Sequence, residues 1–361
     1  MENRPAIGIL TGGGDCPGLN AVIRAVVKAA RYRGWRTIGF KGGYEGLLSP
    51  VHTMALDYHD MGGMLVTGGT ILGTSNRGRF AAKTGKGETH MISDAILAEA
   101  CANVKTLGLI GLVCVGGDGS LTIAQQLFEK GVPVVGVPKT IDNDLECTVA
   151  TFGFDSAVAT ATDALDRLHT TAESHNRVMV LEVMGRHAGW IAASAGISGG
   201  GDVILIPEIP FTFEKVCAKI HERERSGKRF TLVVVAEGAK LKGGELVTQG
   251  EAADREVRLG GIGALVASEI EKRTGKETRV CVLGHLQRGG GPTSFDRLLC
   301  TRFGAHAVDL IAEKRFGRMV ALRPPTTVDV LITEAIGRLR TVPIDGDLVQ
   351  TGRALGVSFG D

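Results

Sequence analysis

The distribution of apolar and polar residues along the chain predicts short β-strands that alternate with amphipathic α-helices. Apolar runs rich in β-branched residues indicate strands at 6–10, 36–40, 109–117, 132–138, 177–185, 202–208, 230–238 and 279–285. Apolar residues recur at helical spacing at 19–34, 121–131 and 155–175. Continuous apolar strands between helices are typical of parallel sheets covered on both faces. We therefore expect an α/β protein with mainly parallel sheets.

The length of the chain divides this pattern into two domains. A chain of 361 residues is long for one domain and suits two. The first series of strands and helices runs to about residue 153, and a long helical stretch from Asp155 opens a second series that ends near residue 286. In sheets of this kind, ligands bind at the carboxyl ends of the strands, where glycine-rich turns let them approach the backbone.

Composition and charge narrow the class of protein further. A hydrophobic fraction of 43% is ample for a core, and a net charge of +2 gives no reason to expect nucleic acid or a membrane surface as a partner. No apolar run reaches the roughly 20 residues of a membrane span, and the N-terminus lacks a signal-peptide pattern. The 7 cysteines are dispersed without a CxxC pair, which favours reduced thiols and a cytoplasmic location.

Glycine is the most unusual feature of the composition, with 52 residues clustered where apolar runs end. The stretch ILTGGGDCPGLNAVIRAV at 9–26 reads as strand, glycine turn and helix. Such a turn can present several backbone N–H groups to an anion, and the helix adds its positive end. An ordinary tight turn would look the same. The stretch lacks the GK[ST] of a Walker loop, so a P-loop kinase is excluded.

Two further strand ends carry carboxylates. Asp118 lies within GGDGS at 116–120, where a divalent metal could bridge it to phosphate oxygens; the alternative is a helix cap, a role that Ser120 could also fill. PKTIDND at 138–144 offers one carboxylate to accept a proton from a substrate hydroxyl, another to hold metal-bound water, and Thr140 to bind substrate. An Asx-turn would explain one of its aspartates but not the cluster.

Arginine and histidine side chains lie at the ends of other predicted strands. The candidates are Arg177, just before the strand at 177–185, and Arg186, His187, His285 and Arg288, which come where strands end. Arginine binds phosphate oxygens in bidentate fashion, although any single arginine could equally form a surface salt bridge. The two histidines lack zinc-site spacing. The residue types alone therefore indicate a magnesium-dependent α/β enzyme that transfers a phosphoryl group between phosphorylated ligands.

The order of motifs resembles the 6-phosphofructokinase family. TGGGDCPGLNAVIR, GGTILGTSNR, GGDGS, PKTIDND, ESHNRVMVLEVMGRHAGW, VAEG and GHLQRGGGPTSFDR follow one another between about residue 5 and about residue 340. The resemblance implies two Rossmann-like αβα three-layer domains with the active site in the cleft between them. Residues 1–153 with 287–337 would form the phosphoryl-donor domain, and residues 154–286 with 338–361 the fructose 6-phosphate domain.

The resemblance also implies a role for individual residues. Asp142 would take the proton from the 1-hydroxyl of fructose 6-phosphate, Asp118 would bind Mg²⁺, and Asp144 would support the water shell of the metal. Gly13 and Arg186 would steady the transferring phosphoryl group. The sugar-phosphate site would comprise Thr140, Ile141, Asp142, Met184, Gly185, Arg186, Glu237, His285, Leu286, Gln287 and Arg288. The nucleotide site would comprise Gly13, Tyr44, Arg77, Gly78, Gly117, Asp118, Gly119 and Ser120.

The resemblance also bears on quaternary structure and regulation. Arg177 and Arg279 resemble two arginines that family members supply to the 6-phosphate site of a neighbouring subunit, which implies a homodimer or homotetramer. Arg24 and Lys28 lie on the first predicted helix, where some members carry effector-binding arginines; regulation stays open.

Two positions bear on the phosphoryl donor, and they disagree. In the family, diphosphate-dependent members usually carry a second Asp after GGD and a Lys before TIDND, whereas this chain has Gly119 and Lys139. An Asp at 119 would exclude ATP by volume and by charge, so Gly119 removes both obstacles. Lys139 can assist either donor. Gly with Lys also resembles an ATP-using subgroup of bacterial and actinobacterial type, and we expect ATP.

Several alternatives compete with this interpretation. A diphosphate-dependent fructose 6-phosphate 1-phosphotransferase is the nearest. An NAD or lipid kinase could share GGDGS but would lack the second domain with VMGRHAG and GHLQRGG. A sugar-phosphate-binding paralogue without activity is disfavoured by the intact Asp118, Thr140, Asp142 and Arg186. A dinucleotide-binding dehydrogenase is disfavoured because TGGGDCPG does not give GxGxxG.

Overall fold

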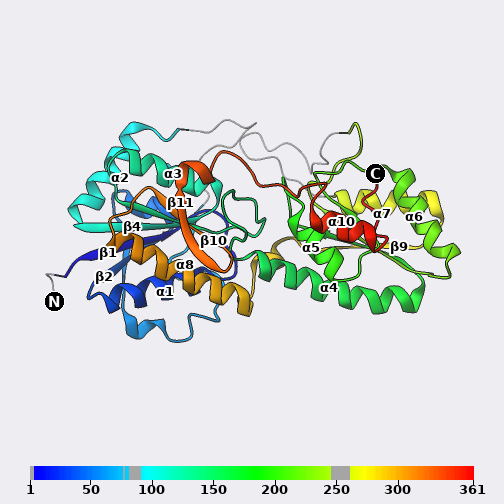
Figure 1. Cartoon of the computed structure of the whole chain (residues 1–361), viewed down its shortest axis with the longest axis horizontal. Coiled ribbons are helices and arrows are strands. Elements are labelled where there is room, and N and C mark those ends of the chain that lie inside the picture. The colour runs from blue at the N-terminus through cyan, green and yellow to red at the C-terminus, as the bar shows by residue number, and fades with distance from the viewer. Residues whose placement is uncertain (1–3, 76–77, 81–90, 245–260) are drawn as a thin grey trace. The chain divides into compact units, whose positions relative to one another are not determined.

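The computed structural model describes residues 4–75, 78–80, 91–244 and 261–361. The chain forms two compact units, each built from separate segments of sequence (Figure 1). The first unit comprises Met1–Ile141, Leu145–Ser156 and Arg288–Leu339, and the second comprises Asp142–Asp144, Ala157–Gln287 and Arg340–Asp361. None of the helices formed by the described residues is both long enough and apolar enough to cross a membrane.

The first unit is built on a seven-stranded sheet in the order β11-β10-β5-β4-β1-β2-β3. Its strands are β1 (Ala6–Thr11), β2 (Arg36–Phe40), β3 (Thr53–Leu56), β4 (Leu109–Gly116), β5 (Val134–Pro138), β10 (Arg318–Arg323) and β11 (Thr326–Leu331). The inner strands pair in parallel, and only the edge strands β3 and β11 are antiparallel to their neighbours. The inner strands β1, β4 and β5 are almost wholly buried, which explains their continuous apolar sequence.

Helices cover both faces of this sheet (Figure 1). On one face lie α1 (Leu19–Tyr32) and α8 (Ser294–Ala312), and on the other α2 (Asp94–Thr106) and α3 (Asp118–Glu129). The remaining helical segments are η1 (Gly43–Leu47), η2 (Tyr58–Met61) and α9 (Ile332–Ala335). Helices α1 and α8 pack closely because Gly304 has no side chain; a Cβ there would lie 2.6 Å from the Cβ of Ala25.

The second unit has a four-stranded parallel sheet in the order β7-β8-β6-β9. Its strands are β6 (Val178–Val183), β7 (Val203–Leu205), β8 (Thr231–Ala236) and β9 (Thr278–Val282). Helices α4 (Phe154–His175) and α5 (Trp190–Ser198) lie on one face, and α6 (Phe213–Arg225) and α7 (Ile262–Thr274) on the other (Figure 1). The segment η3 (Gly284–Arg288) follows β9, and α10 (Asp347–Ala354) packs on α5.

The predicted α/β class with mainly parallel sheets is confirmed. All eight predicted strands are present, although the structure trims several of them by one to four residues. The prediction missed β3 and the hairpin of β10 and β11 at the edges of the first sheet. The edge strands β3 and β11 expose part of their length, so they lack the continuous apolar run of a buried strand. Strand β10 is not an edge strand: it is buried over residues 319–322, and the prediction overlooked its apolar run.

Candidate active site

Three loops of the first unit meet around one cavity. The strands β1, β4 and β5 are parallel neighbours, so the loops that follow them emerge at the same edge of the sheet. The cavity measures about 190 Å³. It is lined by Gly13, Gly14, Gly117, Asp118, Gly119, Ser120, Lys139, Thr140 and Arg288. The sequence predicted all of these as ligand-binding except Gly14, whose place within TGGGD could have indicated it.

Glycine is required where these loops touch. A Cβ on Gly12 would lie 2.7 Å from Oγ of Ser120, and a Cβ on Gly116 would lie 2.2 Å from the Cβ of the same serine. A Cβ on Gly14 would lie 2.7 Å from Nη1 of Arg288. The first loop is fixed to the second by a hydrogen bond of 2.8 Å from Gly12 N to Val115 O. The loops therefore approach so closely that backbone N–H groups, rather than side chains, form much of the cavity wall.

Asp118 stands at the first turn of α3, where the helix presents its positive end to the cavity. The cap position is Gly117, with no side-chain cap, so the alternative role of Asp118 or Ser120 as a helix cap is not the one that the structure adopts. One oxygen of the Asp118 carboxylate accepts a hydrogen bond of 2.9 Å from Gly337 N. The carboxylate is thereby held in place while its residue lines the cavity.

The carboxylates suit Mg²⁺ only together with a phosphorylated ligand. Among the residues that the structure describes, no group of three or more His, Cys, Asp or Glu side chains could hold a metal ion by itself. Magnesium is commonly held by one or two carboxylates, several waters and the phosphates of a substrate. A single cavity carboxylate at a helix N-terminus, Asp118, fits that mode of binding.

Two cations border the glycine loop. Lys139 is 3% exposed, and its ammonium donates a hydrogen bond to the carbonyl of Gly14. Arg288 donates from Nη1 to the carbonyl of Asp15 at 3.0 Å. The sequence assigned Arg288 to the sugar-phosphate pocket, and the structure shows it in the same cavity as Thr140 and the glycine loops. The cavity therefore has positive charge on two sides and is suited to an anion.

Tyr44 supports this cavity, whereas Gly78 lies against Glu45, which is not among the cavity residues. Tyr44 is buried, and its hydroxyl donates to Ser120 O at 2.5 Å, so the tyrosine supports the loop that follows β4. Burial raises the pKa of this hydroxyl well above its usual value, which keeps it protonated as a donor. Gly78 touches Glu45; a Cβ at 78 would lie 2.4 Å from the carboxyl carbon. The predicted Arg77 lies outside the described residues.

The remaining stretch of PKTIDND belongs to two units. Thr140 and Ile141 close the first unit, and Asp142 and Asp144 lie in the second. Both aspartates are half-buried. Asn143 between them is 3% exposed and has a left-handed backbone with φ of 50°, a conformation that asparagine tolerates better than most residues. The loop of the aspartates therefore has a defined and tightly turned backbone.

In the second unit, the loops after β6 and β8 lie against each other. Glu237 N donates to Val183 O at 2.9 Å, and Gly238 N donates to Gly185 O at 3.1 Å. A Cβ on Gly238 would come within 2.0 Å of the carbonyl oxygen of Arg186. The predicted residues Gly185, Arg186 and Glu237 are thus brought together at one edge of the second sheet.

Met184 and Gln287 join the same group through a buried hydrogen bond. Gln287 is fully buried, and its side-chain oxygen accepts from Met184 N at 2.7 Å. Gln287 therefore anchors the loop after β6 rather than facing solvent. His285 and Leu286, its neighbours in η3, are exposed, Leu286 to 67%.

Arg279 lies in the edge strand β9, and Arg177 directly precedes β6, the strand that pairs with β9. Both form ion pairs with Glu277, at 2.8 Å from Nε of Arg177 and 2.5 Å from Nη2 of Arg279. The two cations, with Arg177 first, lower the pKa of the Glu277 carboxyl. The structure thus brings these arginines together on a partly exposed edge of the second unit.

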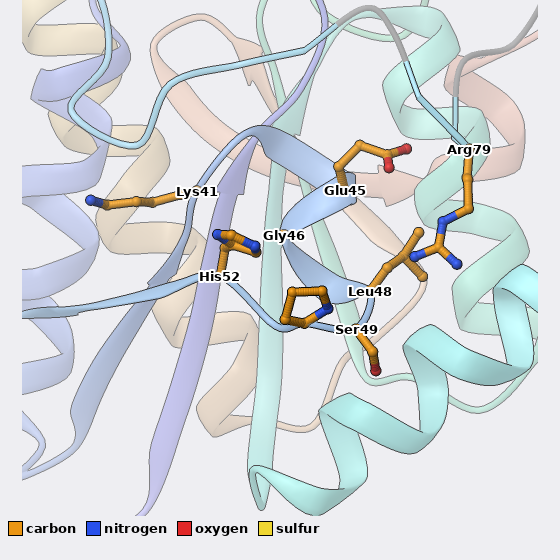
Figure 2. Close-up of a pocket in the computed structure, with 8 residues that line it drawn as sticks. Lys41, Glu45, Gly46, Leu48, Ser49, His52 and Arg79 are labelled. Atoms are coloured by element: carbon orange, nitrogen blue, oxygen red, sulfur yellow. The ribbon is translucent and has the colours of Figure 1, made fainter.

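A second cavity in the first unit is larger but chemically different. It measures about 280 Å³ and is lined by Lys41, Glu45, Gly46, Leu48, Ser49, Pro50, His52 and Arg79. Figure 2 shows Lys41 and Arg79 at opposite ends of it. Arg79 is paired with Glu99 at 2.9 Å, and the Glu45 carboxylate accepts from Phe80 N at 2.7 Å. The charges of Arg79 and Glu45 are engaged within the protein, and none of the glycine-rich strand-end loops lines this cavity. The smaller cavity is therefore the candidate site.

The fold and the smaller cavity together define a class of protein. Parallel strands deliver glycine-rich loops, a helix N-terminus, a carboxylate, a lysine and an arginine to one place. This combination binds phosphate groups and neutralises their charge, which is what enzymes of phosphoryl transfer require. The class is therefore an α/β phosphotransferase without a Walker loop.

Comparison with known proteins identifies the family within this class. Residues 6–311 match the family Phosphofructokinase, and the chain belongs to this family. It is 54% identical to an ATP-dependent 6-phosphofructokinase of Chloroflexus aggregans over 361 residues, which cover 100% of this chain and 99% of the relative. It is 52% identical to a pyrophosphate–fructose 6-phosphate 1-phosphotransferase of Streptomyces coelicolor over 340 residues, 93% of this chain and 96% of the relative.

A solved structure agrees with the family. The phosphofructokinase of Pichia pastoris in the T-state is 31% identical and superposes with a TM-score of 0.81. The alignment covers 93% of this chain but only 36% of the Pichia chain, so the present chain corresponds to about a third of that protein. The resemblance inferred from the motifs is confirmed.

Proposed function

We propose that this chain is an ATP-dependent 6-phosphofructokinase, which phosphorylates the 1-hydroxyl of D-fructose 6-phosphate to give fructose 1,6-bisphosphate in glycolysis. The observation that carries the proposal is the glycine-walled cavity that holds Asp118 and Gly119 beside Lys139 and Thr140. The full-length relatives with this printed activity, at 54% identity, support it.

The reaction needs a proton acceptor and a cradle for phosphate charge. The 1-oxygen of the sugar bonds to the γ-phosphorus of ATP, the bond from that phosphorus to the β,γ-bridging oxygen breaks, and ADP leaves. Asp142 accepts the proton that the hydroxyl loses. Gly13, with its left-handed backbone at φ of 75°, presents the glycine loop to the transferring group, and Arg186 adds positive charge to it. Thr140 contacts the sugar.

Asp118 and the phosphates of the donor would together hold Mg²⁺, and Asp144 would support the water shell of the ion. The ion would supply charge neutralisation on the phosphate oxygens. The protein's own contribution is to fix the Asp118 carboxylate through Gly337 N and to keep the helix N-terminus beside it.

The sugar-phosphate site is assigned to a group of strand-end residues. They are Thr140, Ile141, Asp142, Met184, Gly185, Arg186, Glu237, His285, Leu286, Gln287 and Arg288. Within this group Gln287 acts through the backbone of Met184 rather than by contact with the sugar, because its side chain is fully buried. Arg288 would also serve the phosphoryl group on the donor side, which its place in the lining of the cavity supports.

Gly119 supports ATP as the donor. It is exposed at the first turn of α3, and a Cβ added to it would meet no atom within 4 Å. Nothing from the protein therefore occupies the space in which an Asp would oppose the phosphates of a nucleotide. Lys139 favours neither donor, because its ammonium lies beside the glycine loop that both ATP and diphosphate would use.

A diphosphate-dependent 1-phosphotransferase is the second candidate. Lys139 before TIDND and the Streptomyces coelicolor relative, at 52% identity, favour it. The two percentages of identity are too close to decide the donor, so the decision falls on position 119.

The assembly and the location are also proposals. We place the enzyme in the cytoplasm as a homodimer or homotetramer in which Arg177 and Arg279 reach the sugar-phosphate site of a neighbouring subunit. Their position on the partly exposed edge beside β9 supports this arrangement. A monomeric mass in solution under conditions of full activity would contradict it.

The role of Asp142 gives the test of the proposed function. The variant Asp142→Ser should lower kcat for fructose 6-phosphate and ATP by roughly 100- to 10,000-fold, because a general base contributes about this much. The KM for fructose 6-phosphate should change little. The coupled assay for fructose 1,6-bisphosphate measures both, and Asp163→Ser, which removes an exposed carboxylate of α4, is the control. A near-normal kcat for Asp142→Ser would remove Asp142 as the base.

A further inference from the structure

Arg340 lies against the loop that carries the proposed catalytic base. Its backbone N donates to Asp144 O at 2.9 Å, and its Nη1 donates to Asn143 O at 3.3 Å. One residue thus holds two successive carbonyls directly after Asp142. Asn143, between the two aspartates, is the residue with the left-handed backbone, so the loop is braced at its tightest point.

Trp190 holds Arg340 from the other side. The guanidinium carbon of Arg340 lies 4.3 Å from the centroid of the Trp190 ring. The indole N–H in turn donates to Arg340 O at 3.0 Å. A stacked guanidinium and a hydrogen-bonded backbone fix the arginine in one conformation, which a flexible lysine could not reproduce.

Trp190 belongs to the loop that carries the second proposed catalytic group. It follows Arg186 within GRHAGW and begins helix α5. Glu208 ties this loop to the arginine segment, because its carboxylate accepts from Gly189 N at 2.9 Å and from Val342 N at 2.8 Å. The segment of Arg340 therefore bonds to the loop of Asp142 and to the loop of Arg186 at once.

We propose that Arg340 and Trp190 are positioning residues that hold the loop of Asp142 in a fixed relation to the loop of Arg186. A general base must lie within hydrogen-bond reach of the proton that it takes, and a misplacement of about 1 Å can cost roughly 100-fold in rate. The pair acts on catalysis through these two loops. This inference rests on the proposed function, since it takes Asp142 as the base.

The variant Arg340→Met tests the inference. It keeps an unbranched side chain of similar length but removes the guanidinium that stacks on Trp190 and bonds Asn143 O. We expect kcat to fall by roughly 10- to 100-fold, with the KM for fructose 6-phosphate changed less than about threefold, because substrate binding does not depend on the exact position of the base. Arg340→Lys should recover only part of the loss, because an ammonium cannot stack and donate as a planar fork.

Arg338→Met is the matched control. Arg338 stands two residues earlier, its side chain is 87% exposed, and its contact with Glu146 is long at 3.8 Å. The control removes the same charge from the same segment and should leave kcat and KM at the wild-type values. If Arg340→Met behaves like this control, the inference is wrong. It is equally wrong if Arg340→Met raises KM as strongly as it lowers kcat while the melting temperature falls, because that result describes a purely structural side chain.

Fluorescence separates this inference from the proposed function. The chain has 2 tryptophans, Trp35 and Trp190, so a Trp35→Phe background reports on Trp190 alone. In that background Arg340→Met should shift the emission of Trp190 to longer wavelength as the ring loses its cover. An unchanged spectrum would show that the stacked pair does not exist in solution, whatever the activity. A shifted spectrum in a protein that phosphorylates no fructose 6-phosphate would overturn the proposed function and, with it, the catalytic role given to the pair.

Trp190→Phe provides a second variant if Arg340→Met does not fold. It keeps an aromatic face for the guanidinium and removes the N–H that bonds Arg340 O. We expect a smaller loss of kcat than for Arg340→Met, again with KM retained. A Trp190→Phe enzyme with wild-type kcat, alongside an Arg340→Lys enzyme with wild-type kcat, would contradict a positioning role for the pair.

Discussion

At the scale of single residues, the proposed preference for ATP depends on position 119. Gly119 lies in the first turn of α3 next to Asp118, and space surrounds the point where a Cβ would stand. An Asp there would meet no protein atom and would even interact favourably with the helix N-terminus. Its cost would fall on the ligand, because its charge would oppose the phosphates of ATP.

The variant Gly119→Asp should therefore lose activity with ATP without losing stability. We expect kcat/KM for ATP to fall roughly 100-fold or more, because opposed like charges at a binding site cost several kcal/mol. The melting temperature should stay within a few degrees of the wild type. Gly119→Ala adds a side chain without a charge and is the control. Unchanged ATP kinetics in Gly119→Asp would contradict the argument from charge and volume.

The types of residue in the site could be predicted from the sequence, but their partners could not. Glycines and carboxylates at strand ends indicate a phosphate site because few other functions require them together. The sequence assigns Arg288 to the sugar side, and in the structure its guanidinium donates to Asp15 O beside the glycine loop. Its direction depends on how η3 packs, which no local pattern encodes. The hydrogen bond from Lys139 to Gly14 O could not be predicted either, because it joins residues far apart in the sequence.

At the scale of elements, one buried carboxylate joins the starts of two helices. Asp296 in the first turn of α8 is fully buried and accepts from both Ser156 N, at 2.9 Å, and Ser156 Oγ, at 2.6 Å, at the start of α4. Burial raises the pKa of Asp296 from 3.8 to about 6, although the bonds to Ser156 oppose the shift. The folded protein therefore keeps this proton at a pH where the unfolded chain has released it.

This raised pKa makes a prediction about stability and pH. Between about pH 4 and pH 6 the folded state binds more protons at Asp296 than the unfolded state, so its contribution to stability falls as pH rises and is constant above pH 6. Asp296→Asn keeps an acceptor for Ser156 and cannot ionise. We expect its melting temperature relative to wild type to increase between pH 4.5 and pH 7.5, equivalent to about 2 kcal/mol.

The control for this prediction is Asp309→Asn on the same helix. Asp309 is 47% exposed and pairs with Arg33, so its replacement should not reproduce the trend. Thermal unfolding followed by circular dichroism at both pH values measures all three proteins. A difference between Asp296→Asn and wild type that does not vary with pH would contradict the raised pKa.

Elements were predictable where burial imposes one pattern along their whole length. The buried strands β4, β5 and β8 have continuous apolar sequences, and the prediction located them. The prediction missed β11, the outer strand of the hairpin with β10, because β11 is a half-exposed edge strand. Helix α8 begins at Ser294, inside GGGPTSFDR, and the prediction did not recognise Thr293 as its N-cap, which accepts from Asp296 N.

At the scale of the whole molecule, the chain divides the motif PKTIDND, which carries the proposed base, between two units. Lys139, Thr140 and Ile141 belong to the first unit, while Asp142 and Asp144 belong to the second. The sequence indicated two series of strands and helices, but not that three residues of a strand-end loop would associate with the other unit. That division depends on long-range contacts, such as the bond from Arg340 N to Asp144 O across almost 200 positions of sequence.

The central claim is that the whole enzyme uses ATP to phosphorylate fructose 6-phosphate. The most direct test measures initial rates of fructose 1,6-bisphosphate formation by the wild-type protein with Mg²⁺, comparing ATP with diphosphate at matched concentrations. We predict a kcat/KM for ATP at least about tenfold above that for diphosphate, the discrimination expected when one donor makes additional contacts. A rate with diphosphate well above the rate with ATP would contradict the account.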